Sequence, residues 1–392
     1  MSFADFFDVP EFPLDDAKRR LRENMDMLKA MPVEEQTLYK KFKEVNGGYD
    51  SKIDQSRIVK AKIWTPTDIN NRELTIKEIS NLQPRIRMVE DKSDQMDWLM
   101  LRVFSHTMQF DQNPGRFLKF LVYDEVTEKY LGAVSLGSDV IAISCRDEWI
   151  GWSKETKISG GKLNNTAIGT CIMATQPFGY NFLGGKLVAS MLTTKVVSDA
   201  WEKTYGNKLV GLTTTSLYGS ASMYNSIPFW KKLGKSKGSI SIKPDDDLYK
   251  EWHQYIKEEM PDEYERKVTS KDRVSGPATG VKQQIINMIF KMAGIKAGDY
   301  KHGFERGVYF APLFENTREY LREEINEDEL VPLTKLADDV DSVLNWWKPK
   351  AIKRYEKLMD ENRINGDILY YNELINLTWV QAKQKFLSEV GR

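Results

Sequence analysis

The residues best suited to chemistry form two groups, and the first surrounds an Arg–Asp pair. Arg146 and Asp147 begin the sequence RDEWIGW, and Asn164 and Asn165 follow shortly after it. An aspartate beside an arginine stays ionised and can accept a proton or orient a base. Asparagine amides can hydrogen-bond an oxyanion or the edge of a nucleobase, and Trp152 could stack on a base. A buried ion pair with core tryptophans is the structural alternative.

The second group is the loop 176–186, QPFGYNFLGGK, between an apolar strand and a helical segment. Such a loop leaves backbone N–H groups free to bind phosphates. It matches neither a Walker loop, because Gly185 stands where lysine is required, nor the dinucleotide pattern G-x-G-x-x-G. Glycines that only permit a tight turn and close packing are the alternative. The predicted cofactor-binding residues are Gln176, Gly179, Asn181, Gly184, Gly185 and Lys186.

Part of this loop carries a family resemblance. Gln176-x-x-Gly179-x-Asn181 resembles the acyl-CoA loop of the GNAT acyltransferases, Gln/Arg-x-x-Gly-x-Gly/Ala, although Asn181 replaces the small final residue. The resemblance implies a GNAT-like fold and a bound donor, acyl-CoA or another acyl or aminoacyl compound.

The same resemblance implies a tyrosine acid four residues before a Gly-Phe ending. That position is Trp230, which cannot donate a catalytic proton. Tyr218 and Tyr224 lie nearby, and either could supply the acid. We therefore predict Asp147, Asn164, Asn165 and one of these tyrosines around the acceptor.

The surrounding pattern predicts the elements that must position these residues. Residues 117–137 predict a β-hairpin, 139–152 a further strand, 186–205 one long helix, and 220–235 a short helix that ends in WKKLGK. A late strand, GVYFAPLF, would return to the sheet. The predicted fold is α/β (α+β), with a GNAT-like mixed and mostly antiparallel sheet flanked by helices.

Three regions follow from the same reading. Residues 1–90 predict a helical N-terminal extension, with helices at 15–31 and 33–45. Residues 91–314 form the core, with a helical insertion at about 239–299. Residues 315–392 form an acidic and then helical C-terminal extension. Its segment 315–341 has ten acids against three bases and could recruit a protein partner or cover a basic surface.

Basic residues follow Trp230. Residues 230–243 contain five lysines and no acid, which suits salt-dependent phosphate contacts, although a solvated charged face is the simpler explanation. The helix at 281–295 could belong to a helix–turn–helix. The predicted nucleic-acid contacts are Arg146, Trp152, Lys231, Lys232, Lys235 and Lys237.

Composition restricts the class of protein. The chain has 392 residues, zero formal net charge and two cysteines without a CxxC pair. The acidic start is not a signal peptide, and no apolar run is long enough to cross a membrane. The three histidines lack metal-ligand spacing, so we predict no metal. We expect a cytoplasmic protein with free thiols.

Several short blocks together are similar to the DruA-type domain, named for a protein of the Druantia anti-phage system and also found in phage and mobile-element proteins. The blocks are RDEWIGW, LNNTAI, KLVASM, TYGNKLVGLTTT, YNSIPFWKKLGKSKG and GVYFAPL, within residues 90–314. The resemblance implies a nucleic-acid context in defence or counter-defence. A GNAT-like fold in that context is also similar to the Mom-type DNA modification proteins of phages.

Three functions remain open. The leading hypothesis is an acyl or aminoacyl transferase that modifies a nucleobase amine in DNA. The second is a non-catalytic DNA-binding subunit of a defence or mobile-element system, favoured by the departures at Asn181 and Trp230. The third is an N-acyltransferase for a protein or small molecule.

Overall fold

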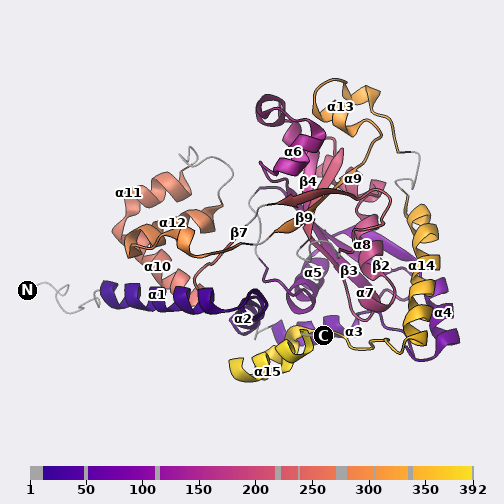
Figure 1. The fold of residues 1–392 in the computed structure, drawn as a ribbon, viewed down its shortest axis with the longest axis horizontal. Helices are drawn as coiled ribbons and strands as arrows, with labels where there is room; N and C mark the ends of the chain where they lie inside the picture. The colour runs from indigo at the N-terminus through magenta and orange to yellow at the C-terminus, as the bar shows by residue number, and fades with distance from the viewer. Residues whose placement is uncertain are drawn as a thin grey trace, which may run out of the picture.

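The computed structural model describes residues 12–47, 52–110, 115–216, 222–236, 239–270, 280–303, 305–333 and 339–390. Its centre is a seven-stranded sheet with helices on both faces, and a helical lobe stands to one side (Figure 1). The predicted α/β class, with a mixed and mostly antiparallel sheet, is confirmed.

The sheet has the strand order β1-β2-β3-β4-β5-β9-β6. Only β4 and β5 are parallel, and every other neighbouring pair is antiparallel. The strands are β1 (Pro84–Met88), β2 (Phe117–Asp124), β3 (Tyr130–Ser138), β4 (Thr166–Ala174), β5 (Gly211–Ser216), β6 (Lys231–Ser236) and β9 (Arg306–Pro312). The predicted hairpin is β2–β3, and the predicted returning strand is β9.

The sheet has an apolar layer on each face, because successive side chains of a strand point to opposite faces. On β2, Phe120 and Val122 point into one layer and Leu121 into the other. The first layer is covered by α4 (Arg72–Asn81), α7 (Phe178–Asn181), α8 (Gly184–Met191), α9 (Lys195–Tyr205) and α14 (Val340–Asp360). The second is covered by α2 (Val33–Asn46), α3 (Ile53–Ala61), α5 (Lys92–Ser105), the 3-10 turn Tyr371–Asn376 and α15 (Trp379–Val390).

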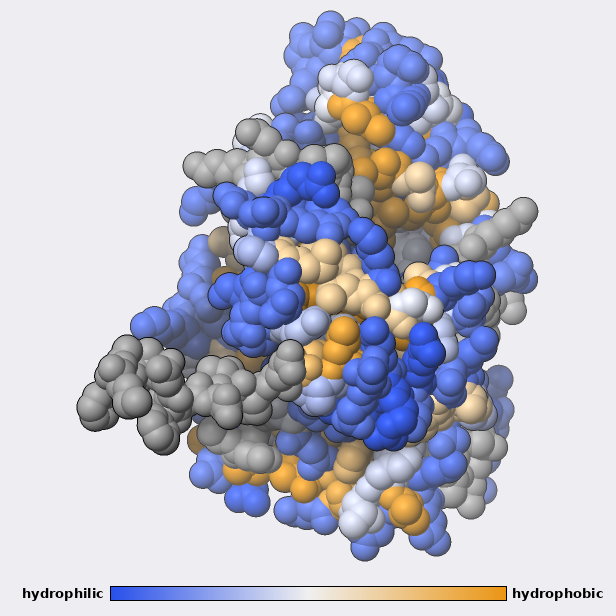
Figure 2. All heavy atoms as spheres, turned by 90° about the vertical axis from the view of Figure 1, so that its left-hand side faces the viewer, coloured by the Kyte–Doolittle hydropathy of each residue, from blue (hydrophilic) through white to orange (hydrophobic). Residues whose placement is uncertain are grey.

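The side lobe joins two segments that are distant in sequence. Helix α1 (Leu14–Ala30) packs Leu21 and Met25 against α10 (Asp246–Glu259) and α12 (Val281–Ala293). The lobe also contains α11 (Pro261–Tyr264) and the short strands β7 (Ser239–Ser241) and β8 (Lys301–Gly303). Figure 2 views this end of the molecule, whose face is mostly hydrophilic with an apolar band across its middle.

Packing in the lobe decides the role of α12. Its apolar residues Ile285, Ile289 and Phe290 are buried against α1 and α10, so this helix is a core element of the lobe. The helices predicted at 15–31 and 33–45 are confirmed as α1 and α2. Strand β1, within the predicted N-terminal extension, forms one edge of the sheet, and α14, within the C-terminal extension, covers its first layer.

Three predicted elements were wrong. Residues 139–152 contain the helix α6 (Ser144–Ile150) instead of a strand. The single helix predicted over 186–205 is broken between α8 and α9, where the hydroxyl of Thr194 donates to the carbonyl of Met191. The helix predicted over 220–235 is, within the described residues, a run of turns followed by β6, because Lys231–Ser236 pair with β9 at the sheet edge. Pairing with a distant strand overrode the local helical pattern.

Candidate functional site

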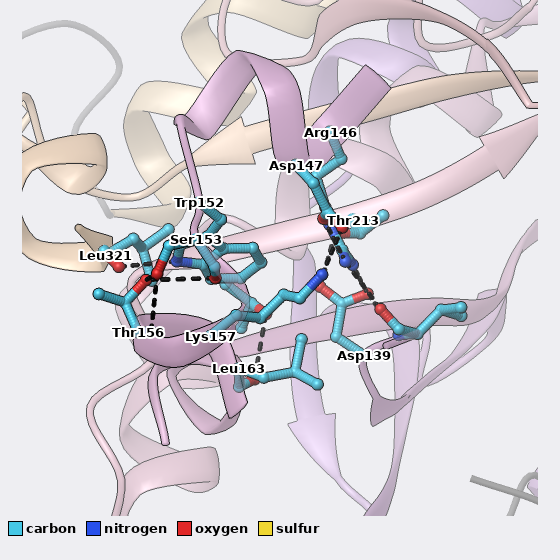
Figure 3. A network of polar contacts seen from close by, with 12 residues as sticks. Asp139, Arg146, Asp147, Trp152, Ser153, Thr156, Lys157, Leu163, Thr213 and Leu321 are labelled. Atoms are coloured by element: carbon cyan, nitrogen blue, oxygen red, sulfur yellow. Dashed lines mark hydrogen bonds and ion pairs between the residues drawn. The ribbon is translucent and has the colours of Figure 1, made fainter. Parts of the chain in front are cut away.

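A buried arginine organises the first predicted group. Arg146 on α6 has no exposed side-chain surface and lies between two aspartates (Figure 3). Its Nη1 is 2.7 Å from Oδ1 of Asp139. The two groups form an ion pair, but their geometry is not that of a hydrogen bond. Its Nε and Nη2 donate to Oδ1 of Asp147 at 2.9 and 2.7 Å. One guanidinium therefore contacts both the buried carboxylate of Asp139 and the partly buried carboxylate of Asp147.

Neighbouring side chains complete this network. Lys157 donates to the second oxygen of Asp147 at 2.6 Å, and Thr213 on β5 donates to Asp139 at 2.7 Å. Asp147 is thus held between two cations, a setting that favours a fixed acceptor over a general base. The network ties α6 and the turn after β3 to the middle of the sheet.

The sequence marks the end of helix α6 by Gly151, the residue that follows the helix. Gly151 has a φ of 82°, and its N–H donates to the carbonyl of Asp147, which is the usual glycine ending of a helix. This places Arg146 and Asp147 on a helix, which corrects their predicted position at a strand end.

The other predicted contacts of this group are engaged within the protein. The Trp152 indole N–H donates to the carbonyl of Leu321 at 2.7 Å, and its ring lies 5.2 Å from the Arg146 guanidinium. Arg146 cannot reach a nucleic acid because it is fully buried, and Trp152 covers it. The prediction of nucleic-acid contact by Arg146 is therefore corrected to a structural role, whereas the partly exposed ring of Trp152 remains a predicted contact.

The asparagine pair lies at the start of β4. Asn165 is buried, and its amide donates to the carbonyl of Lys208 at 2.8 Å. Asn164 is exposed, and its carbonyl accepts from Arg116 at 3.1 Å. Of the two side chains, only that of Asn164 is open to solvent.

The predicted donor loop satisfies its own backbone. The N–H groups of residues 179–182 donate, in order, to Thr175 O, Gln176 Oε1, Pro177 O and Phe178 O. These four groups are therefore not directed at a ligand, which corrects the expectation of a free N–H cradle in this part of the loop.

Asn181 links this loop to the C-terminal region. It is fully buried, its amide donates to the carbonyls of Pro177 and Asn365, and its carbonyl oxygen accepts from the N–H of Asn365 at 3.0 Å. A small residue here would lose all three bonds. The departure from the GNAT pattern at this position thus has a structural reason.

The rest of the loop packs against the segment after β5. A side chain at Gly184 would collide with the ring of Phe178, and one at Gly185 with Met223. Lys186 donates to the carbonyls of Met223 and Asn225, so it joins the two sides of the predicted cleft. Burial lowers the pKa of the Lys186 ammonium.

The structure separates the two predicted groups. Asn165 precedes β4 and the loop from Gln176 follows it, so a nine-residue strand lies between them. At the usual rise per residue such a strand spans about 26 Å. Asp147 is likewise tied to the end of β3, beside the start of β4. The two groups therefore do not line one compact reaction centre.

Among the predicted acids, Tyr218 lies outside the described residues, and Tyr224 is buried. The Tyr224 ring packs against Trp230 and Tyr309, and burial raises the pKa of its hydroxyl. That hydroxyl lies 3.5 Å from Oγ1 of Thr214, which in turn donates to the carbonyl of Gly169 on β4. Trp230 donates its indole N–H to the carbonyl of Ala189 and is a packing residue.

The predicted lysines lie on the edge strand β6. Lys231, Lys232 and Lys235 are exposed, and Lys235 pairs with Glu305 at 2.7 Å. Lys237 lies outside the described residues. The outer strand of a sheet thus presents ammonium groups to solvent.

Trp149, from the RDEWIGW segment, lies beside Lys231 at this edge of the sheet. Trp149 is partly exposed and packs on Phe310 with ring centroids 5.4 Å apart. Lys231 and Arg318 both lie over its ring, at 5.3 and 5.1 Å from the centroid. We call Trp149, Lys231, Lys232 and Arg318 the edge cluster. Arg318 comes from α13 (Thr317–Leu321), and no local sequence signal connects it to Trp149.

Across the described residues, no three His, Cys, Asp or Glu side chains gather where they could hold a metal ion. In the same part of the chain, no helix combines the length and apolar character that a membrane span needs.

Comparisons with known proteins give one relationship. A family model described as "Druantia protein DruA" matches residues 50–323. A protein of Escherichia coli (strain UMEA 4076-1), named Druantia protein DruA, is 25% identical over 293 residues, which cover 70% of each chain. No solved structure matches the chain significantly. The matched segment contains the whole sheet and leaves α1, α2, α14 and α15 outside it.

Proposed function

Because this chain belongs to the DruA family, which is named for the Druantia anti-phage system, we propose that it acts in phage defence by contacting DNA through the edge cluster. The observation that carries the proposal is the partly exposed ring of Trp149 with Lys231 and Arg318 over it, at the edge strand that also carries the exposed Lys232. Lys231, Lys232 and Arg318 form no ion pair with a carboxylate of the described residues. Unpaired cations at a sheet edge suit contacts with phosphates.

This proposal assigns the fold a binding role without an acyl donor. It is supported by the internal bonds of residues 179–182 and by the separation of the two predicted groups along β4. The acidic segment 315–341 carries Arg318 of the edge cluster and also exposes Glu323, Glu327 and Asp328, and these three acids are proposed as a contact for a protein partner. The cations would attract DNA and the acids would repel it, so together they would orient the DNA on the protein surface.

A charge-removal experiment tests the edge cluster. We expect the triple variant Lys231→Gln, Lys232→Gln and Arg318→Gln to bind a labelled DNA duplex at least about tenfold more weakly. The slope of log affinity against log salt should fall by about 0.9 for each phosphate that the variant no longer neutralises. Fluorescence anisotropy over a salt series measures both quantities.

A matched variant controls for overall charge. Lys77, Lys92 and Lys203 are exposed and lie on α4, α5 and α9, so their replacement by glutamine removes the same charge from other surfaces. This variant should bind duplex DNA like the wild type. Equal weakening in both variants, or a wild type without affinity for duplex DNA, would contradict the proposal.

A transferase is the second candidate, and the divergence of β4 from β5 favours it. The two parallel strands pair only over Thr166–Ile168 and Gly211–Thr213, although both continue beyond these residues. The Tyr224 hydroxyl lies 3.5 Å from Oγ1 of Thr214, the first β5 residue beyond this pairing, and burial keeps the hydroxyl protonated. The acceptor would be a nucleobase amine of DNA, or else an amine of a protein or small molecule, and the donor would need groups other than the bonded N–H groups of the loop.

Mass spectrometry separates this candidate from the first. If the protein modifies DNA, nucleosides from cells expressing it should contain a modified base, and Tyr224→Phe should reduce that base by about a hundredfold, the usual contribution of a general acid. Tyr309→Phe is the control, because it removes a neighbouring buried hydroxyl that bonds Asn225 instead. An unmodified nucleoside profile in wild-type cells would exclude DNA modification.

A further inference from the structure

Helix α14 presents a row of cations on its solvent side. Lys350, Lys353, Arg354 and Lys357 are spaced i, i+3, i+4 and i+7, so they share one face over about 10 Å of helix. Lys350, Lys353 and Lys357 are exposed, and Arg354 is partly exposed. These four residues lie outside the segment 50–323 that matches the family model, so the family match says nothing about them.

The buried side of α14 fixes the helix to the core. Trp347 is fully buried and donates its indole N–H to the carbonyl of Phe182 at 3.0 Å. Tyr355 is also buried and donates to the carbonyl of Ile69 at 2.7 Å. A rigid helix holds its surface charges at fixed spacing, which lowers the entropy lost when a ligand binds.

Most of these charges lack a partner within the described part of the protein. Lys350, Lys353 and Arg354 form no ion pair with a described carboxylate, and the Nε of Arg354 is buried without a hydrogen-bond acceptor there. Lys357 lies 3.6 Å from Glu361. The nearby Asp360 is paired with Arg72. The row therefore keeps a positive surplus for an external anion.

Two aromatic rings stand beside the cations. Tyr180 is 38% exposed, and the guanidinium of Arg354 lies 5.3 Å from its ring centroid. Trp346 is partly exposed, with the ammonium of Lys350 at 5.5 Å from its ring. Tyr180 belongs to α7, so the surface joins the loop after β4 to the C-terminal helix.

We infer that this surface, the α14 face, binds single-stranded nucleic acid: Lys350, Lys353, Arg354 and Lys357 contact successive phosphates, and unpaired bases stack on Tyr180 and Trp346. Cations next to accessible aromatic rings are the combination that single-strand binders use, because every base has a face that can stack. A duplex keeps those faces inside its stack and would gain only the phosphate contacts. The inference goes beyond the duplex contact proposed at the edge cluster and uses none of its residues.

Two variants test the two kinds of contact. We expect Lys350→Gln, Lys353→Gln and Arg354→Gln together to weaken binding of a labelled oligothymidylate at least about tenfold. The salt slope should fall by about 2, at roughly 0.7 for each phosphate of a single strand that is no longer neutralised. Tyr180→Leu should weaken binding by about tenfold, the effect of removing one base stack, and leave the salt slope unchanged. Fluorescence anisotropy gives both values, and thermal unfolding followed by circular dichroism confirms that the variants fold.

Controls separate this result from the proposal at the edge cluster. The variant of Lys77, Lys92 and Lys203 and the variant of Lys231, Lys232 and Arg318 should both bind oligothymidylate like the wild type. A wild type that binds oligothymidylate but no duplex would overturn the edge cluster and leave the α14 face supported.

Three results would overturn the inference itself. The first is oligothymidylate binding that the α14 triple variant leaves unchanged. The second is a wild type that does not bind oligothymidylate at all. The third is polyglutamate displacing the wild type's oligothymidylate as effectively as unlabelled oligothymidylate does, together with a Tyr180→Leu variant that binds like the wild type. That result would identify the α14 face as a surface for an acidic protein.

Discussion

Replacing Arg146 by methionine is expected to lower the free energy of unfolding by about 3–5 kcal/mol, the range found when one partner of a buried ion pair is removed. The guanidinium is the shared partner of Asp139 and Asp147, and methionine would leave the buried Asp139 with only hydrogen bonds from Thr213 and a backbone N–H among the described residues. Urea denaturation followed by circular dichroism measures the decrease.

A second substitution shows whether the buried charge is the cause. Adding Asp139→Asn to the methionine variant removes one uncompensated carboxylate, so the double variant should recover part of the missing stability. Arg57→Met is the exposed control, because Arg57 pairs with Asp54 at the surface, and it should change stability by less than about 1 kcal/mol. A decrease at Arg146 no larger than that at Arg57 would show that the network contributes nothing to folding.

Replacing Lys41 by methionine is expected to have an effect of similar size, about 3–5 kcal/mol, for the same reason. Lys41 is fully buried on α2, 2.5 Å from Oε2 of Glu44, and donates to the carbonyl of Val103 at 2.8 Å. The variant leaves a buried carboxylate and a carbonyl of the last turn of α5 without this donor. Lys43→Met on the same helix is the control, because Lys43 reaches the exposed Asp247 at the surface.

Lys41 also predicts a dependence of stability on pH. Burial lowers the pKa of its ammonium to about 8, whereas an unfolded lysine has a pKa of about 10.4. Between these values the unfolded chain binds more protons, so raising the pH stabilises the folded state; below pH 8 both states are protonated and the effect is absent. The difference in stability between wild type and Lys41→Met should therefore grow from about pH 8 to about pH 9.5. A difference that is constant or shrinks over this window would contradict the pKa shift.

Local sequence patterns were sufficient for much of the fold. The hairpin β2–β3, the helices α1, α2 and α12 and the strand β9 were all predicted, because alternation and helical spacing of apolar residues depend on neighbours only. Helix α6 was missed although Gly151 marks its end. Strand β6 could not be found locally, because its six residues are held as a strand by β9, about seventy residues away.

Among the site residues too, contacts between sequence neighbours were predicted and contacts between distant segments were not. The sequence identified Arg146 and Asp147 as a pair, and the structure confirms that they are in contact. The sequence alone did not show that Asp139 and Thr213 would enclose the arginine, and this enclosure is what removes it from nucleic acid. Trp149 and Arg318 meet only because α6 and α13 pack on the same end of the sheet.

Residue types at short spacing were enough to predict the class of fold, the order of most elements and the family resemblance. Tertiary structure alone decided which polar groups remain available. Residues 179–182 looked like a free anion cradle, yet their N–H groups are bonded within the loop, and Asn181 is bonded to Asn365. The length of β4 separates the predicted donor loop from Asn165 and Asp147, which lie at the other end of this strand. Burial and distance depend on segments far apart in the chain, so no local pattern contains them.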